Sequence, residues 1–181
     1  MRQNSLPLQY RIFTAVGAIL ALTVAVYILY TAGLPRESKE PFGPIRPFTA
    51  DTIQGETIIV DKSLNRPVIL NFWATWCVPC VVEMPRLQQV YDDFGNEGLV
   101  VIGINAGQED VRDVQAFTIS QKLTFPIVMD DNRDIDKLYE LRGVLPTTVF
   151  IDNEGNIRKI VYGKLTEGSL TEALAEIGLA G

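Results

Sequence analysis

The chain has 181 residues, of which 47% are hydrophobic and 21% charged, and its net charge is −6. This balance is typical of a single globular domain and excludes a disordered chain. With two cysteines and no histidine, the composition also excludes a disulfide-stapled scaffold and a zinc site built from the usual four Cys and His ligands.

The N-terminal part contains a long apolar run. Residues 12–30, IFTAVGAILALTVAVYILY, carry no charge and as a helix nearly match the hydrocarbon core of a membrane, about 30 Å thick. Arg2 and Arg11 precede the run without an acidic residue, which predicts a cytoplasmic N-terminus at residues 1–11. We expect an uncleaved transmembrane anchor. The alternative is a cleaved signal peptide, whose apolar region is usually shorter, about 7 to 15 residues.

A change of composition follows the apolar run. Residues 34–47 contain four prolines and charges of both signs, which is typical of an extended linker. We therefore expect a linker at residues 31–44 and a folded domain at residues 45–181. All 22 acidic residues but only 14 basic ones lie from position 36 onward. The resulting net charge of −8 argues against nucleic acid, or an anionic membrane surface, as a binding partner.

Strand-like and helix-like segments alternate within the domain. Residues 67–73 form a near-continuous apolar run, as expected of a strand buried on both faces. Apolar residues at helical spacing follow, up to Gly95. A second buried strand is expected at residues 99–104, and shorter helices are expected near residues 111–117 and 135–139.

The C-terminal part predicts a hairpin and a last helix. Residues 147–152 and 157–162 flank an Asn-Glu-Gly-Asn turn, which is a hairpin pattern. Ser169 and Glu172 have the spacing of a capping box, which places the start of the last helix there. The order of elements predicts an α/β domain with a central sheet covered by helices on both faces.

The two cysteines lie three positions apart, directly after the first buried strand, in the pentapeptide WCVPC. The next helix is expected to begin near Cys77, where unpaired backbone N–H groups and the helix dipole stabilise a thiolate. Such a setting lowers a thiol pKa from about 8.5 to between about 3.5 and 7.5. Cys80, one turn further, is expected to be more buried and to attack a mixed disulfide on Cys77. Because a disulfide in so short a loop adds little stability, the pair indicates redox chemistry, with two inert buried thiols as the alternative.

Four stretches resemble a known family: LNFWATWCVPCVVEMP, VIGINAG, LTFPIVMDDN and RGVLPTTVFIDNEGNI. They are similar to the thioredoxin superfamily, and within it to the membrane-anchored TlpA/ResA-like thiol-disulfide oxidoreductases. The resemblance covers roughly residues 47–177. It implies a thioredoxin-like fold with a mixed sheet, no metal and no cofactor beyond the redox-active cysteine pair. It also implies a place in the bacterial cytoplasmic membrane with the domain on the extracytoplasmic side.

The resemblance assigns roles near the cysteine pair. It makes Cys77 the nucleophile and Cys80 the resolving cysteine. Trp76 would form an apolar wall for the substrate protein. Pro146 is the counterpart of the superfamily's cis-proline, and the backbone of Leu145 before it would pair with an extended substrate segment.

The helix after the cysteines carries a further candidate. Glu83 lies on the same helix face as Cys80 and matches a family glutamate implicated in tuning the cysteine pKa values and handling protons. The alternative is a glutamate that merely favours the helix N-terminus. Asn71 stands where ordinary thioredoxins have a buried aspartate, and because Asn cannot titrate, the proton acceptor is expected to be Glu83. Pro79 fits the first helical turn and Pro85 resembles a helix-kinking proline, so both are expected to be structural.

The resemblance implies that the activity is the reduction of disulfides in selected proteins, such as apocytochrome c or copper-site proteins, with a membrane protein as electron donor. One alternative is an oxidant or isomerase of the same fold. Another is a module that delivers Cu(I) held between the two thiolates. A peroxidase is disfavoured because a peroxidatic cysteine follows a Thr by three residues, and here that position is Ala74.

Overall fold

The computed structural model describes residues 20–26 and 42–179, and the chain divides into two compact units, Met1–Lys39 and Glu40–Gly181. Residues 20–26 are helical. The remainder of the predicted anchor at residues 12–30, and most of the predicted linker, lie outside the described residues. Within the described ranges no helix combines the length and hydropathy that a membrane crossing needs. The transmembrane anchor therefore stays a prediction.

The second unit is built on a five-stranded sheet in the order β5-β4-β3-β6-β7. The strands β3, β4 and β5 run parallel to one another, whereas β6 and β7 are antiparallel to their neighbours. The sheet is therefore mixed, as expected. Its strands are β3 (Val68–Trp73), β4 (Val100–Asn105), β5 (Ile127–Met129), β6 (Thr147–Ile151) and β7 (Ile157–Tyr162).

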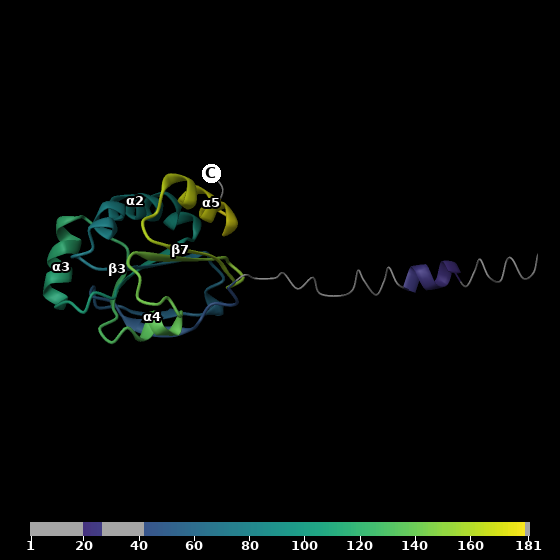
Figure 1. Ribbon diagram of the computed structural model, residues 1–181, viewed down its shortest axis with the longest axis horizontal. Helices are drawn as coiled ribbons and strands as arrows, with labels where there is room; N and C mark the ends of the chain where they lie inside the picture. Colours follow the sequence, from purple (N-terminus) through teal and green to yellow (C-terminus); the bar gives the residue numbers. More distant parts are fainter. Residues whose placement is uncertain (1–19, 27–41, 180–181) are drawn as a thin grey trace, which may run out of the picture. The chain divides into compact units, whose positions relative to one another are not determined.

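Four α-helices and two short 3-10 helices accompany the sheet, and a separate antiparallel pair precedes it. The α-helices are α2 (Val78–Phe94), α3 (Val111–Ser120), α4 (Asp134–Leu138) and α5 (Glu167–Glu176), and the 3-10 helices are η1 (Lys62–Leu64) and η2 (Gly95–Glu97). Figure 1 shows the sheet, with β3 and β7 labelled, between α2 and α5 on one side and α4 on the other. The antiparallel pair is β1 (Phe48–Asp51) with β2 (Thr57–Val60). The sequence patterns did not reveal β1, β2 or β5, because each has only three or four residues and β1 alternates half-buried and exposed positions.

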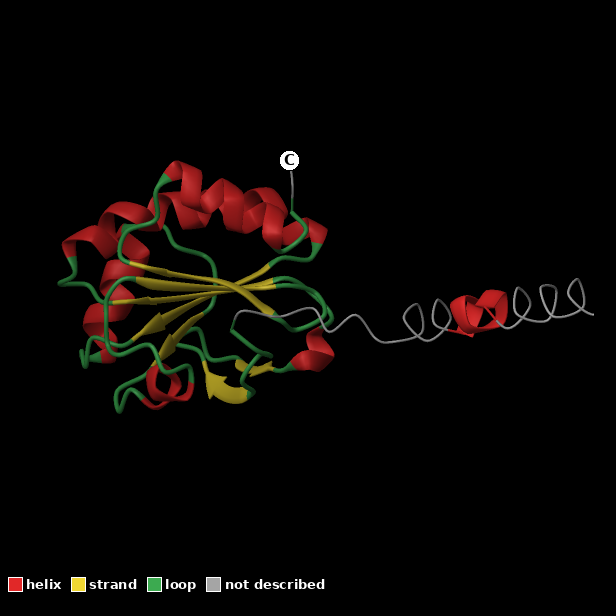
Figure 2. Cartoon of the chain, turned by 45° about the vertical axis from the view of Figure 1, so that its right-hand side comes forward, coloured by secondary structure: helices red, strands yellow, loops and turns green. Residues whose placement is uncertain are grey.

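Strand β3 separates two hydrophobic cores, because successive side chains point to opposite faces of a sheet. Ile69 and Trp73 belong to the core beneath α2 and α5, whereas Leu70 and Phe72 belong to the core beside α4. Figure 2 shows α2 and α5 along one face of the sheet and α4 near the other. All six residues of β3 are buried, as predicted for a strand covered on both faces.

The predicted capping box of the last helix is wrong by three residues. The N-cap is Thr166, whose Oγ1 accepts a hydrogen bond from the Ser169 backbone N–H at 3.2 Å, while Ser169 Oγ accepts from the Thr166 backbone N–H at 3.0 Å. Ser169 therefore occupies the third helical position. The apolar stripe used to locate the helix begins only at Leu170, so it could not reveal the first turn.

Gly103, in the middle of β4, marks a close approach between strand and core. A Cβ at this position would lie 2.6 Å from Ile127 Cδ1 and 3.0 Å from Phe125 Cε2. We expect Gly103→Ala to lower the free energy of unfolding by about 1–3 kcal/mol, because neighbouring side chains must shift. Urea unfolding measures this. Gly168→Ala in α5 is the matched control: a Cβ at this position would have no atom within 4 Å, so the substitution should be neutral or stabilising. Equal effects of the two substitutions on the free energy of unfolding would contradict the packing shown for β4.

Candidate active site

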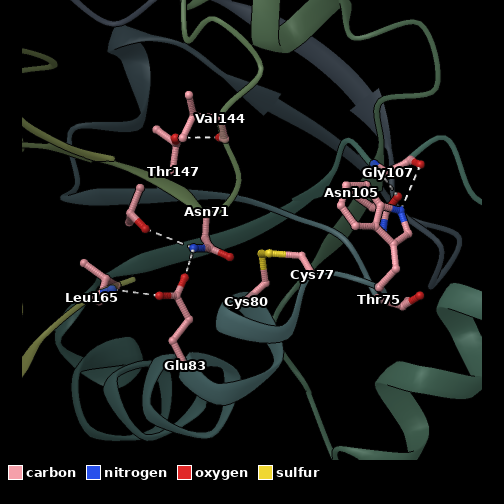
Figure 3. The surroundings of a disulfide bond; sticks show 12 residues. Asn71, Thr75, Cys77, Cys80, Glu83, Asn105, Gly107, Val144, Thr147 and Leu165 are labelled. Atoms are coloured by element: carbon pink, nitrogen blue, oxygen red, sulfur yellow. Dashed lines mark hydrogen bonds between the residues drawn. A yellow bond between two sulfur atoms is a disulfide. The ribbon is translucent and has the colours of Figure 1, made fainter. Parts of the chain in front are cut away.

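The two cysteines form a disulfide where β3 ends and α2 begins (Figure 3). Cys77 is the N-cap of α2, and its backbone N–H donates to Ala74 O at 3.3 Å. Pro79 lies in the first turn of the helix, where its missing N–H leaves no hydrogen bond unmade. The predicted position of Cys77 at the helix start is therefore confirmed. At this position the helix dipole favours a thiolate.

The two sulfur-bearing residues differ in their access to solvent. Cys77 is 6% exposed and Cys80 is fully buried. Trp76, directly before Cys77, is 63% exposed, and its indole Nε1 donates to Gly107 O at 3.3 Å. Solvent therefore reaches the pair at Cys77, beside the exposed Trp76, and does not reach Cys80.

Glu83 is a buried carboxylate, 3% exposed, on the second turn of α2. Its Oε1 accepts from Asn71 Nδ2 at 2.9 Å, and its Oε2 accepts from the Leu165 backbone N–H at 2.8 Å. Burial raises the pKa of Glu83, and the Leu165 N–H, the Asn71 amide and the charge of Lys164 partly offset that rise. Such a group can hold or release a proton closer to neutral pH than an exposed glutamate.

The segment before β6 lies next to the end of β3. The register pairs Thr147 with Phe72, so the residues preceding Thr147 fall beside the turn that leads to the cysteines. The Leu145–Pro146 peptide bond is cis, as the resemblance implied. Thr147 Oγ1 donates to Val144 O at 2.7 Å, and Figure 3 shows this turn in the surroundings of the disulfide. The predicted substrate contacts of Leu145 and Trp76 stay predictions.

Glu109, which the sequence analysis missed, joins the loop after β4 to the loop that carries the cysteines. Its carboxylate accepts from the Thr75 backbone N–H at 2.9 Å, from Thr75 Oγ1, and from Asn105 Nδ2 at 2.8 Å. Thr75 lies two residues before Cys77. The signal was present in the sequence, because Thr75 and Glu109 lie in the loops that follow the two buried strands, and the carboxyl ends of parallel strands meet at one edge of a sheet.

The remaining predicted residue, Pro85, lies inside α2, in keeping with its expected structural role. The residues brought together around the disulfide are therefore Trp76, Pro79, Glu83 and the 144–147 turn. Among residues 20–26 and 42–179, no group of three or more His, Cys, Asp or Glu side chains is placed to hold a metal ion.

Comparison with known proteins identifies the family. The sequence profile of the AhpC/TSA family matches residues 43–160. The thiol-disulfide oxidoreductase ResA of Bacillus subtilis is 32% identical over 88% of this chain and 89% of its own, and the ResA of Bacillus cereus is 33% identical over 92% and 96%. The chain belongs to the ResA-like thiol-disulfide oxidoreductases.

Solved structures bear out the fold of this ResA-like chain. The crystal structure of StoA from Bacillus subtilis is 33% identical with a TM-score of 0.60, covering 70% of this chain and 95% of StoA. A thiol:disulfide interchange protein of the thioredoxin family from Chlorobium tepidum gives a TM-score of 0.65 at 25% identity, covering 73% and 93%. The predicted thioredoxin-like fold is confirmed, and the Cys77–Cys80 disulfide is its redox group.

The contacts of Glu109 predict the effect of removing its charge. In Glu109→Gln the amide oxygen can still accept from the N–H donors of Thr75 and Asn105, but an NH₂ group replaces the oxygen that accepts from Thr75 Oγ1, and all three contacts lose the negative charge of the carboxylate. We expect the free energy of unfolding to fall by about 1.5–3 kcal/mol, the usual range for hydrogen bonds to a charged group, as measured in urea. As a control, Glu167→Gln changes an exposed partner of Arg86 and should cost less than about 0.5 kcal/mol. Equal losses of stability in Glu109→Gln and Glu167→Gln would contradict the three hydrogen bonds accepted by Glu109.

The raised pKa of Glu83 predicts a pH dependence of stability. In the folded state this carboxyl holds its proton above the usual 4.5, so its contribution to stability is fully present below that pH and is lost as pH rises through the folded pKa. Glu83→Gln cannot ionise. We expect the variant to gain stability relative to the parent chain as pH rises from about 4.5, in urea unfolding at a series of pH values. A difference independent of pH, or a gain in the opposite direction, would show that burial does not raise this pKa.

Proposed function

We propose that the chain reduces disulfides of selected proteins on the extracytoplasmic side of the bacterial cytoplasmic membrane, to which residues 12–30 tether it. Its substrates in this proposal are proteins such as apocytochrome c or copper-site proteins. The observation that carries the proposal is the asymmetry of the pair: a nucleophile position at the start of α2 for Cys77, and complete burial for Cys80.

The surface around the disulfide supports a protein substrate. Four large apolar side chains are exposed there: Trp76 at 63%, Val78 at 73%, Val82 at 55% and Val144 at 42%. Apolar side chains gathered around a reactive group are typical of a protein-binding surface. The apolar wall expected of Trp76 therefore extends along the first turns of α2 and to the turn before the cis-proline.

The proposed reaction moves two electrons in two exchange steps. The Cys77 thiolate attacks one sulfur of a substrate disulfide, forms a mixed disulfide and releases the other substrate sulfur as a thiolate, which takes up a proton. Cys80 then loses its proton and attacks Cys77 Sγ. The Cys77–Cys80 disulfide forms, and the second substrate sulfur leaves as a thiolate that is protonated in turn.

Glu83 is the proposed acceptor for the proton of Cys80. It lies one helical turn beyond Cys80, and a carboxylate whose pKa is raised by burial is a better proton acceptor than an ordinary glutamate. Glu83 also lines an open surface groove with Val82, Arg86 and Lys164, which offers the proton a route to water. The alternative role, a favourable charge near the helix N-terminus, does not explain a carboxylate buried to 3% exposure.

Each turnover leaves the protein oxidised, so a reductant must restore the dithiol. We propose a membrane protein with its own dithiol as that donor, because soluble thiol pools of the cytoplasm do not reach an oxidising compartment. The same Cys77, which is 6% exposed, would serve as the point of attack, since Cys80 is 0% exposed.

The reduction potential of the full chain in a mild detergent tests the direction of electron flow. We expect a value near or below about −250 mV, on the side of thioredoxin at about −270 mV. It is measured by equilibration with dithiothreitol or glutathione buffers and thiol alkylation. A value near about −120 mV, typical of a strong oxidant, would replace the proposal with disulfide formation.

Two single-cysteine variants test the roles of the thiols. Cys80→Ser should accumulate a mixed disulfide with a model substrate protein, because the resolving thiol is missing, whereas Cys77→Ser should form none. Non-reducing gel electrophoresis after acid quenching separates the two outcomes. A mixed disulfide in the Cys77→Ser chain would reverse the assignment of nucleophile and resolving cysteine.

A further inference from the structure

Asn71, in the middle of β3, has a buried amide whose nitrogen forms hydrogen bonds while its oxygen forms none. Its Nδ2 donates to Glu83 Oε1 at 2.9 Å and to Thr148 Oγ1 at 3.0 Å. Its Oδ1 is buried and has no hydrogen-bond partner within the described part of the chain. An ionised carboxylate can only accept, so the nitrogen has to face Glu83 and the oxygen has to face the other way.

The unpaired oxygen points toward the disulfide. Figure 3 shows the amide of Asn71 lying between Glu83 and Cys80, with its nitrogen toward the carboxylate and its oxygen toward the sulfur of Cys80. Asn71 and Cys80 are both 0% exposed. A disulfide sulfur carries no hydrogen, so in the oxidised state the oxygen has no donor on that side. A buried acceptor without a donor is costly and calls for a physical explanation.

We propose that Asn71 is a positioning residue for Cys80: in the dithiol form the Cys80 S–H donates a hydrogen bond to Asn71 Oδ1. Reduction of the disulfide adds two electrons and two protons, and the proton on Cys80 supplies the donor that the oxygen lacks. The bond exists in the reduced state and not in the oxidised one. One amide, held at its nitrogen by Glu83, thus fixes the direction of the resolving thiol.

The catalytic meaning of this hydrogen bond rests on the proposed function. The bond has two consequences for that function. It stabilises the dithiol relative to the disulfide, so it makes the protein easier to reduce. It also favours the protonated form of Cys80, so the thiol is held in place until its proton leaves and the attack on Cys77 begins. The hydrogen bonds from Asn71 to Glu83 and Thr148 are available in both redox states, so they do not favour the dithiol over the disulfide.

Infrared spectroscopy of a single-thiol chain tests the bond directly. The chain has two cysteines, so in Cys77→Ser every S–H stretching signal comes from Cys80. We expect this band at a lower wavenumber in Cys77→Ser than in Cys77→Ser combined with Asn71→Ala, since a hydrogen bond weakens the S–H bond. The same band position in both chains would overturn the proposal.

Two further measurements guard against a merely structural effect. Thr148→Val removes the other partner of Asn71 Nδ2 but leaves Oδ1 untouched, so in the single-thiol chain it should leave the band where it is; a shift as large as that of Asn71→Ala would overturn the proposal. If Asn71→Ala does not fold, the Cys77→Ser band is compared with that of a cysteine derivative in an apolar solvent. A band at the position of the free thiol would again overturn it.

The redox equilibrium gives a second readout. In the chain with both cysteines, we expect Asn71→Ala to lower the equilibrium constant for reduction by dithiothreitol about fivefold, the usual net contribution of one hydrogen bond. At about 30 mV per tenfold, this is a potential about 20 mV more negative. An unchanged or raised equilibrium constant would contradict the stabilised dithiol. If the unsubstituted chain has an oxidising potential, the proposed direction of electron flow is wrong. The infrared result would still test the hydrogen bond between Cys80 and Asn71.

Discussion

Strand β3 is the constraint on which the rest of the domain depends. It is buried on both faces and hydrogen-bonded on both edges, to β4 and to β6. Because its position is fixed from all sides, its carboxyl end gives a rigid base for the turn that carries the cysteines. A redox pair needs such a base, since thiol exchange requires sulfur atoms held in line. The helix that follows adds the electrostatic part by placing Cys77 at its N-terminus.

The same burial explains why the polar chemistry is organised as it is. A carboxylate within a core is tolerated only with hydrogen-bond partners, and Glu83 has Asn71 on one oxygen and the Leu165 backbone on the other. These partners come from β3 and from the segment after β7, so the carboxylate ties α2 to both. Burial keeps its affinity for the proton high while the contacts keep it in place. The stability of the fold and the proposed proton transfer therefore depend on the same atoms.

Around this buried centre, the surface is built from loops at one edge of the sheet. Glu109 holds the loop of Thr75, and Gly107 O receives the indole of Trp76. These loops follow β3 and β4, whereas the turn that contains the cis-proline precedes β6, which pairs with β3 on the side away from β4. The exposed apolar side chains thus stand on a rigid scaffold, which lowers the entropy lost when a partner protein binds.

The sequence by itself determined the order of most elements, the position of Cys77 at a helix start and the family, because these depend on periodicity and on residues close together in the chain. Only the tertiary structure decided the contacts of Glu109 with Thr75, which are 34 positions apart, and of Glu83 with Leu165, which are 82 apart. It also decided which way the Asn71 amide faces. Hydrophobic patterns show which faces are buried, but they do not specify which distant polar atoms meet there, since that follows from strand pairing and register.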